Sequence, residues 1–301
     1  MKPFKTTLLT IAIPLLLFSC KEISAPIEIT TDHFHTAIDK VVEVMIHDIF
    51  SPPVASRVFV YPNIAAYEIL AQNDSSYFSL KNQIKHLGAI PKPNLSKTIN
   101  YPLAALIAHI HLSKQLIFSE DKIERHRDSL YNVWEATNPR EFKDSKAYGL
   151  KVAAYISDWM NKDNYAQTRT MPKFSVDSED EGRWQPTPPS YMDGLEPHWN
   201  KIRSFVLDSA DQFKPIPPPK FSMNKNSDFY KELVEVYEIS KEITKKGDTS
   251  EEIAIAQFWD CNPYVSVTRG HLMFAVKKIT PGAHWIGITK IAAKKEKADF
   301  N

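Results

Sequence analysis

Four closely spaced histidines in this 301-residue chain are candidate metal ligands. They form two pairs, His33 with His35 and His109 with His111, each with one residue between its members. Residues two apart on a helix point to different faces, and neither pair has a Cys, Asp or Glu at a ligand spacing that repeats. We therefore predict no metal site at either pair.

Three charged residues are placed to converge between the first two expected helices. They are Asp48, Arg57 and Glu68. Arg57 and Glu68 are eleven residues apart, about three helical turns, so they share one face if the bend expected at Pro62 is mild. Such a group is either a catalytic site or a buried ion network that holds two helices together, and we favour the structural role.

A second group of residues with ionisable or nucleophilic side chains lies in the C-terminal part of the sequence. It consists of Asp260, Cys261, His271 and His284. Cys261 would act as a nucleophile only with a neighbouring base and a lowered pKa, which a sequence does not reveal. Partly buried side chains with structural roles are the favoured interpretation. The chain also lacks G-x-S-x-G, H-E-x-x-H, C-x-x-C and a glycine-rich phosphate loop, so motifs alone indicate no reaction.

Composition narrows the class of protein that must position these residues. The 37 Lys and Arg residues balance 36 Asp and Glu residues, and 43% of residues are hydrophobic. A disordered chain and a nucleic-acid binder driven by bulk charge are therefore excluded. Only 8 glycines but 21 prolines occur, which favours helices joined by proline-marked loops. With two cysteines, the chain is not a disulfide scaffold.

The N-terminus has the pattern of a bacterial lipoprotein signal peptide. Lys2 and Lys5 precede an apolar run at 8–18, which is shorter than the roughly 20 residues of a membrane-spanning helix. The run ends in LFSC at 17–20, which resembles a lipobox with Cys20 as the acylated residue. We expect an exported outer-membrane lipoprotein, on the periplasmic or surface side, anchored through Cys20. An ordinary secretory signal or an apolar helix is the alternative.

The apolar residues of the mature chain recur at helical spacing, which predicts an all-α fold. No window alternates with period two over more than a few residues, so strands are at most minor. The predicted domains are a signal peptide at 1–20, a helical region at 21–171, a proline- and aromatic-rich loop at 172–222, and further helices at 223–301. The helices expected first run from Thr31 to Ile49, Pro53 to Leu70, Tyr101 to Phe118, Ser119 to Trp134, and around Val152 to Met160.

The segment 172–222 holds nine of the 21 prolines, a density that excludes a helix. It is either an exposed linker or a long ordered loop held by buried aromatic residues, and we favour the ordered loop. The aromatic residues expected to be buried are Phe174, Trp184, Tyr191, Trp199, Phe205, Phe213 and Phe221. Beyond the loop, Thr249 and Glu252 form a capping-box pattern before another helix.

Six sequence blocks, in order and at matching spacing, carry a resemblance to a known family. They are DIFSPPVASR at 48–57, YPNIAAYE at 61–68, WQPTPPSYMDGLEPHW at 184–199, DQFKPIPPPKFS at 211–222, IAQFWDCNPY at 255–264 and PGAHWIGI at 281–288. The chain resembles the N-terminal half of bacterial lipoproteins related to vanadium-dependent haloperoxidases and type 2 phosphatidic acid phosphatases. The resemblance implies an all-α fold whose first helices support a helical bundle that holds an oxyanion site.

The motifs that form this oxyanion site in the family are absent from the sequence. The family uses a Lys followed after six residues by Arg-Pro, then Pro-Ser-Gly-His, then Ser-Arg with a His six residues beyond. This chain has no Arg-Pro and no Ser-Gly-His, and Ser56-Arg57 is followed by Asn63 at the His position. We therefore expect the C-terminal catalytic helices to lie beyond Asn301, which makes 223–301 the truncated start of the haloperoxidase-like domain. A natural C-terminus that frays is the alternative.

Three functions stay open at this point. The resemblance implies that a full-length parent uses vanadate and peroxide to oxidise halide, or hydrolyses phosphate esters without vanadate, whereas this chain alone holds no cofactor and is inactive. The chain's partners would be the membrane and the missing C-terminal bundle, with no nucleic acid. The alternatives are a non-enzymatic surface lipoprotein that binds a ligand or partner through 172–222, and a degenerate family member that lost its site.

Overall fold

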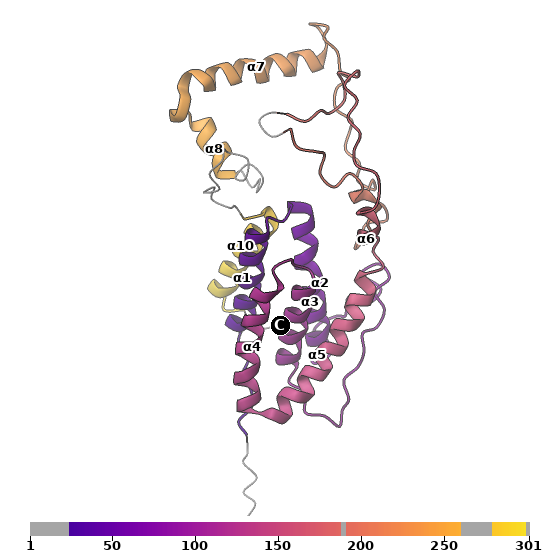
Figure 1. Ribbon diagram of the computed structural model, residues 1–301, viewed down its shortest axis with the longest axis vertical. Coiled ribbons are helices and arrows are strands. Elements are labelled where there is room, and N and C mark those ends of the chain that lie inside the picture. The colour runs from indigo at the N-terminus through magenta and orange to yellow at the C-terminus, as the bar shows by residue number, and fades with distance from the viewer. Residues whose placement is uncertain (1–23, 188–190, 260–278, 299–301) are drawn as a thin grey trace, which may run out of the picture.

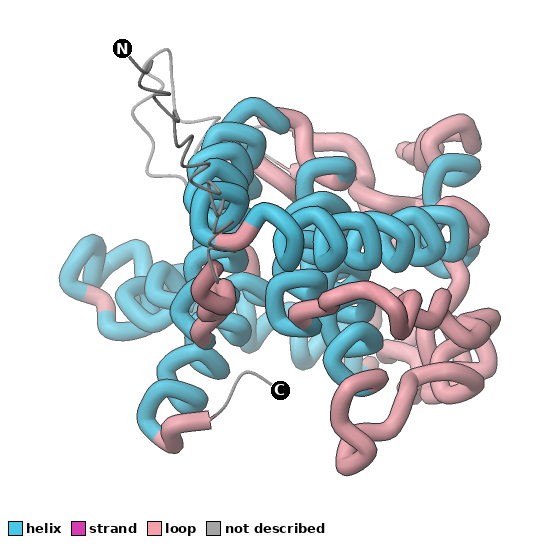
Figure 2. Tube along the Cα trace, turned by 90° about the horizontal axis from the view of Figure 1, so that it is seen from below, coloured by secondary structure: helices cyan, strands magenta, loops and turns pink. Residues whose placement is uncertain are grey.

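The structure is a computed structural model that describes residues 24–187, 191–259 and 279–298. The described residues form helices and loops and contain no strand, which confirms the predicted all-α fold. Most helices gather in one bundle, and the chain after α6 leaves the bundle to form an extended arm that carries α7 and α8 (Figure 1). Seen from below, helices and loop segments occupy largely different sides of the molecule (Figure 2).

The observed helix boundaries follow the sequence pattern closely in the first half of the chain. The bundle comprises α1 (Thr31–Asp48), α2 (Pro52–Ala71), α3 (Tyr101–Gln115), α4 (Glu120–Thr137), α5 (Pro139–Met160) and the short α6 (Tyr165–Thr168). The later elements are η1 (Trp199–Lys201), α7 (Asp228–Lys246), η2 (Gly247–Thr249), α8 (Glu251–Trp259) and α10 (Pro281–Lys295). The helix predicted from Tyr101 ends at Gln115, three residues before the expected Phe118.

Local capping fixes where these helices begin. Four of them, α2, α3, α5 and α10, carry a proline in the first turn, where its missing N–H costs nothing. The side chain of Asn100 accepts a hydrogen bond from the N–H of Leu103 at 3.0 Å, and Asn138 accepts one from Glu141 at 3.2 Å. Each cap satisfies an N–H that the helix itself leaves without a partner.

The capping box predicted from Thr249 and Glu252 does not form, and a simple cap one residue later takes its place. The N-cap is Ser250, not Thr249, because Thr249 belongs to η2 and its hydroxyl donates to the carbonyl of Lys246. The hydroxyl of Ser250 accepts from the N–H of Ile253 at 3.3 Å and donates to Glu252 at 2.6 Å. The short turn before the helix thus moves the cap toward the C-terminus.

The centre of the bundle is α3, which packs against α1, α2, α4 and α5. Most of its side chains are buried, including Leu106, Ile107 and Leu112. A glycine on α5 allows the closest approach, since a Cβ built on Gly149 would lie 2.5 Å from the carbonyl oxygen of Ala104. These small residues let α3 and α5 pack with their backbones near contact.

Only a middle part of the 172–222 loop packs on the bundle. Trp199 and Phe205 are partly buried against the core. The prediction that all seven aromatic residues are buried is wrong for the other five, which are exposed: Phe174, Trp184, Tyr191, Phe213 and Phe221. Proline has no backbone N–H to donate. The proline-rich segments therefore lack the regular backbone hydrogen bonds that would hold them against the core. Two of the exposed rings instead form a local pair, Phe174 with Trp184 at 5.5 Å.

The helices after the loop differ in how they meet the bundle. Neither α7 nor the described part of α8 contains a buried side chain. By contrast, α10 packs against α2, and Lys290 and Lys294 form ion pairs with Asp39 and Asp32 of α1. Among the described residues, no helix has the length and hydropathy needed to cross a membrane.

Candidate functional site

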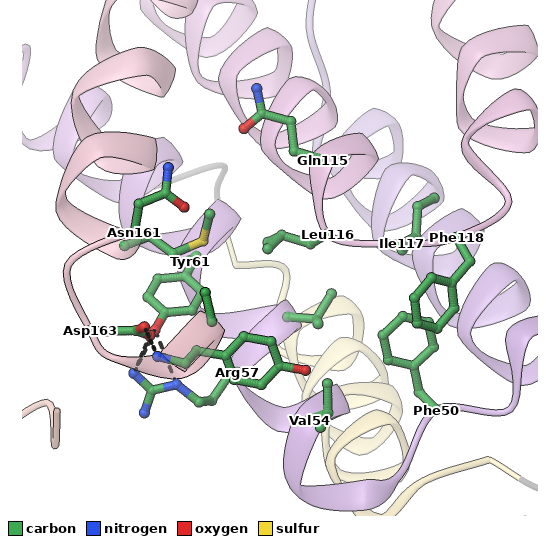
Figure 3. A pocket seen from close by; sticks show the side chains of 14 residues that line it. Phe50, Val54, Arg57, Tyr61, Gln115, Leu116, Ile117, Phe118, Asn161 and Asp163 are labelled. Atoms are coloured by element: carbon green, nitrogen blue, oxygen red, sulfur yellow. Dashed lines mark hydrogen bonds and ion pairs between the residues drawn. The ribbon is translucent and has the colours of Figure 1, made fainter. Parts of the chain in front are cut away.

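A cavity of about 380 Å³ lies where α2, the connection between α3 and α4, and the end of α5 meet (Figure 3). Its walls are mostly apolar, with a polar cluster at one side. The residues that line it are Phe50, Val54, Arg57, Val58, Tyr61, Gln115, Leu116, Ile117, Phe118, Met160, Asn161, Asp163, Tyr165 and Ala166.

The polar cluster consists of Arg57, Tyr61 and Asp163. Arg57 and Tyr61 are one turn apart on α2, which places both side chains on the same face. The guanidinium donates to the Tyr61 hydroxyl (Nε to Oη, 3.0 Å) and to Asp163 (Nη2 to Oδ2, 3.0 Å), while the Tyr61 hydroxyl donates to the same carboxylate oxygen. The side chains of Arg57 and Asp163 are only 11% and 3% exposed, so this is a largely desolvated ion pair.

Backbone contacts of the same cluster attach the irregular chain after α5 to the bundle. The N–H of Tyr165 donates to Asp163 Oδ1 at 2.7 Å, and the N–H of Arg203 donates to the Asp163 carbonyl at 2.8 Å. In return, Arg57 Nη2 donates to the carbonyl of Arg203 at 3.2 Å. The guanidinium also lies 4.5 Å from the ring centre of Phe205. Arg57 therefore joins α2 to two segments more than 100 residues away.

The electrostatics of the cluster make it a structural clamp at neutral pH. Burial, followed by the hydrogen bond to Asp163, raises the pKa of Tyr61 far above its ordinary value of 10.0. The phenol therefore keeps its proton, and the cluster holds one positive and one negative charge.

The predicted convergence of Asp48, Arg57 and Glu68 is wrong. Asp48 accepts hydrogen bonds from the N–H groups of Phe118 and Ser119, at 3.1 and 2.9 Å, and so holds the start of α4. Burial would raise the Asp48 pKa, but the hydrogen bonds from Ser119 and His47 outweigh it and the pKa is lowered. Asp48 thus holds the start of α4 and does not meet Arg57.

Glu68 has equally local partners. It is 1% exposed and accepts from the hydroxyl of Ser79 at 2.8 Å and from the N–H of Leu80. The described residues provide it with no salt bridge. The carboxylates at 48 and 68 are satisfied by the backbone of neighbouring loops, which leaves Arg57 to pair with Asp163, 106 residues away.

The histidines of the two pairs have separate local contacts. His33 Nδ1 accepts from the N–H of Thr30 at 3.1 Å, while His109 is buried beside Phe34 with ring centres 5.0 Å apart. His111 lies 3.1 Å from the amide of Gln115. Within the described part of the chain, no three His, Cys, Asp or Glu side chains come together as a metal site.

The C-terminal group of candidates is mostly outside the described residues. Asp260, Cys261 and His271 all lie there, so their predicted proximity stays a prediction. His284 is described and is an exposed residue of α10, whose N–H donates to the carbonyl of Thr280 at 3.0 Å. Cys20, the expected lipidation site, also lies outside the described residues.

The described residues of the cavity do not fit vanadate. An oxyanion of that charge density needs several cations and N–H donors that converge on one point. Among the described residues that line the cavity, Arg57 is the one Lys or Arg, and Asp163 offsets its charge. No chemical step through vanadate follows from this cavity.

Sequence reasoning missed two of the three residues in the cluster. Tyr61 had a usable signal, because it lies four residues after Arg57 on a predicted helix and opens the block at 61–68. Asp163 had none: it lies in a four-residue turn between α5 and α6, and only the tertiary fold brings it to α2.

Comparisons with known proteins give the family. No protein-family model matches the chain, and no curated protein matches it. Among solved structures, the crystal structure of a bacterial vanadium-dependent iodoperoxidase is similar, with 65% sequence identity and a TM-score of 0.86. The match covers 92% of this chain and 64% of the iodoperoxidase, so the chain spans less than two thirds of that protein. With this identity along nearly its whole length and the same helical fold, the chain belongs to the vanadium haloperoxidase superfamily.

Proposed function

We propose that the chain is the N-terminal part of a vanadium-dependent haloperoxidase that oxidises iodide with peroxide. The observation that carries the proposal is the 65% identity to a bacterial vanadium-dependent iodoperoxidase. At that identity the sequence favours the same reaction class over phosphate-ester hydrolysis, which the superfamily resemblance left open. The helices described above would then support the catalytic domain and contribute no ligand of the oxyanion.

The oxyanion site belongs, in this proposal, to a segment outside the 301 residues. Two facts support this assignment: the chain spans 64% of the iodoperoxidase, and its sequence lacks Arg-Pro and Ser-Gly-His. Vanadate is accordingly proposed as the cofactor of the complete enzyme. The first 301 residues alone are proposed to be inactive.

The test is the intact mass and activity of the native protein purified from its source membranes. We expect a polypeptide well above 34.4 kDa that converts iodide to triiodide only with hydrogen peroxide and vanadate. Hydrolysis of p-nitrophenyl phosphate by the vanadate-free protein would instead identify a phosphatase. A mass that matches this sequence without its signal peptide, together with no iodide oxidation, would contradict the enzyme proposal.

We also propose that Cys20 carries the lipid anchor of an exported protein. The LFSC sequence after an apolar run supports it. Metabolic labelling with a palmitate analogue should mark the wild-type protein and not Cys20→Ser. Equal labelling of both would contradict an anchor at this cysteine.

A non-enzymatic binding role for 172–222 is the second candidate function. The exposed aromatic and apolar residues of this segment favour it, among them Trp184, which is 50% exposed, and Phe213. Trp184→Ala should abolish binding of a polysaccharide or protein partner while the chain stays folded. Trp199→Ala is the structural counterpart, because Trp199 packs on the core and its loss should lower stability.

A further inference from the structure

The cavity beside α2 has the size and walls of a small-molecule site. Its volume of about 380 Å³ lies within the roughly 300–1,000 Å³ of typical ligand pockets. Val54, Leu116, Ile117 and Met160 provide apolar walls from three different helices or their ends. A molecule that enters it exchanges water for apolar contact on several sides.

The charges at the cavity rule out an ionic ligand. Arg57 is already bound to Asp163 and to Tyr61, so the site has no net charge to offer an anion or a cation. A charged ligand would lose its hydration without gaining an ion pair. Neutral amides are present, since Gln115 and Asn161 also line the cavity. The Gln115 amide already pairs with His111 at 3.1 Å and accepts from the hydroxyl of Ser157 at 3.2 Å. The Asn161 amide is therefore the group that suits a single hydroxyl or ring N–H on the ligand.

An exposed aromatic ring indicates the chemistry of the ligand. Phe118 is 80% exposed, although it lines the cavity and stacks on the buried Phe50 with ring centres 4.9 Å apart and planes at 25°. Figure 3 shows this pair on the opposite side of the cavity from Arg57 and Asp163. Among the described residues, no side chain covers the outer face of Phe118. A flat aromatic molecule would cover it and extend the stack.

We infer that this cavity binds a neutral aromatic molecule of one or two fused rings that carries one hydroxyl or ring N–H. The ring lies among the apolar walls against Phe118, and the polar group meets the amide of Asn161. The inference does not depend on vanadate or peroxide. It assigns the chain a binding site of its own, separate from the oxyanion site of the proposed enzyme.

The test is titration of the folded chain with 2-naphthol, with 2-naphthoate as the charged counterpart, followed by calorimetry and ligand-observed NMR. We expect 2-naphthol to bind with a Kd below about 1 mM and 2-naphthoate to bind at least about tenfold more weakly. No binding of 2-naphthol, or equal binding of the two compounds, would overturn the inference.

Two variants locate the site. Ala166→Trp fills the cavity from an exposed position on α6, and Ala136→Trp places the same side chain on the exposed face of α4 as a control. We expect the first to raise the Kd for 2-naphthol at least about tenfold and the second to leave it unchanged, with both proteins melting near the wild-type temperature. Equal affinity of both variants would show that 2-naphthol binds elsewhere and overturn the assignment. Phe118→Ala, at an exposed position, should weaken binding without loss of fold.

Discussion

Helices α3 and α7 have similar lengths, 15 and 19 residues, but opposite environments. Leu106 of α3 is fully buried, whereas Leu233 of α7 is 41% exposed, and α7 has no buried residue at all. Both helices have a side-chain cap, Asn100 for α3 and Ser227 for α7. They differ in pattern, because α3 is apolar on nearly every face whereas α7 is polar with one apolar stripe. Caps therefore specify that a helix forms, and apolar residues on every face indicate which helix the core surrounds.

The Arg57 cluster marks the boundary between these two regions. At 199–205 the irregular chain lies against the bundle, where Arg57, Asp163 and Lys85 hydrogen-bond to its backbone. The exposed aromatic segments before and after it, and α7, extend away from the core (Figure 1). Stability should therefore reside in the bundle and at this boundary, and little of it in α7.

Loss of the Arg57 side chain should have the largest effect. Arg57→Ala leaves the carboxylate of Asp163 buried without a cation, which costs about 3–5 kcal/mol of unfolding free energy in comparable cases. Urea denaturation followed by circular dichroism measures it. Arg125→Ala is the control, because its ion pair with Asp121 is solvent-exposed and worth only about 0–1 kcal/mol. Equal, small losses for both variants would show that the cluster is not a clamp.

Acid should weaken the bundle through His109. Burial lowers the pKa of its imidazole from 6.5 to about 4, so the folded state keeps it neutral while the unfolded state takes up a proton below pH 6.5. Stability from this group is complete above pH 6.5 and falls by about 3 kcal/mol as the pH drops toward 4.

The measurement is the unfolding free energy at several pH values for the wild type and His109→Gln. We expect the variant to lose the part of the pH dependence that His109 supplies, while His35, His111 and His126, whose pKa values burial also lowers, keep theirs. Identical slopes for the two proteins would refute the assignment.

The close contact between α3 and α5 leaves no room for one added methyl group, so a larger residue there should lower stability. Gly149→Ala places a Cβ 2.5 Å from the Ala104 carbonyl oxygen and should cost about 1–3 kcal/mol through overpacking. The matched control is Gly287→Ala in α10, where a Cβ meets nothing within 4 Å. That variant should be stabilised by about 0.5–1 kcal/mol, since alanine is the better helix former. Thermal melts that rank the two variants in the opposite order would contradict the packing described.

The smallest effect is expected on α7. Leu233→Ala should change the unfolding free energy by no more than about 0.5 kcal/mol, because the side chain is exposed. The same substitution at Leu106 should cost about 2–5 kcal/mol through a buried cavity. A large loss at Leu233 would mean that α7 is covered in solution.

Much of the bundle was predictable because its signals are local. Proline at a first turn, a polar cap and apolar spacing act within a few residues, and the start predicted for α2 at Pro53 lies one residue from the observed Pro52. The site was less predictable. The helix pattern placed Arg57 and Glu68 on one face, with Asp48 expected to join them. This convergence does not occur, because loop N–H groups hydrogen-bond to both carboxylates.

The sequence by itself determined the all-α class, the main helix boundaries, the proline-rich break at 172–222 and the superfamily. These properties follow from local helix propensities and from ordered sequence blocks, both of which can be read directly from the sequence. The tertiary structure alone decided that Asp163 pairs with Arg57, that Trp199 and Phe205 are covered while Trp184 is exposed, and that a cavity lies beside Phe118. Such choices depend on contacts between residues far apart in the sequence, and their free energies depend on burial, which exists only once the chain has folded.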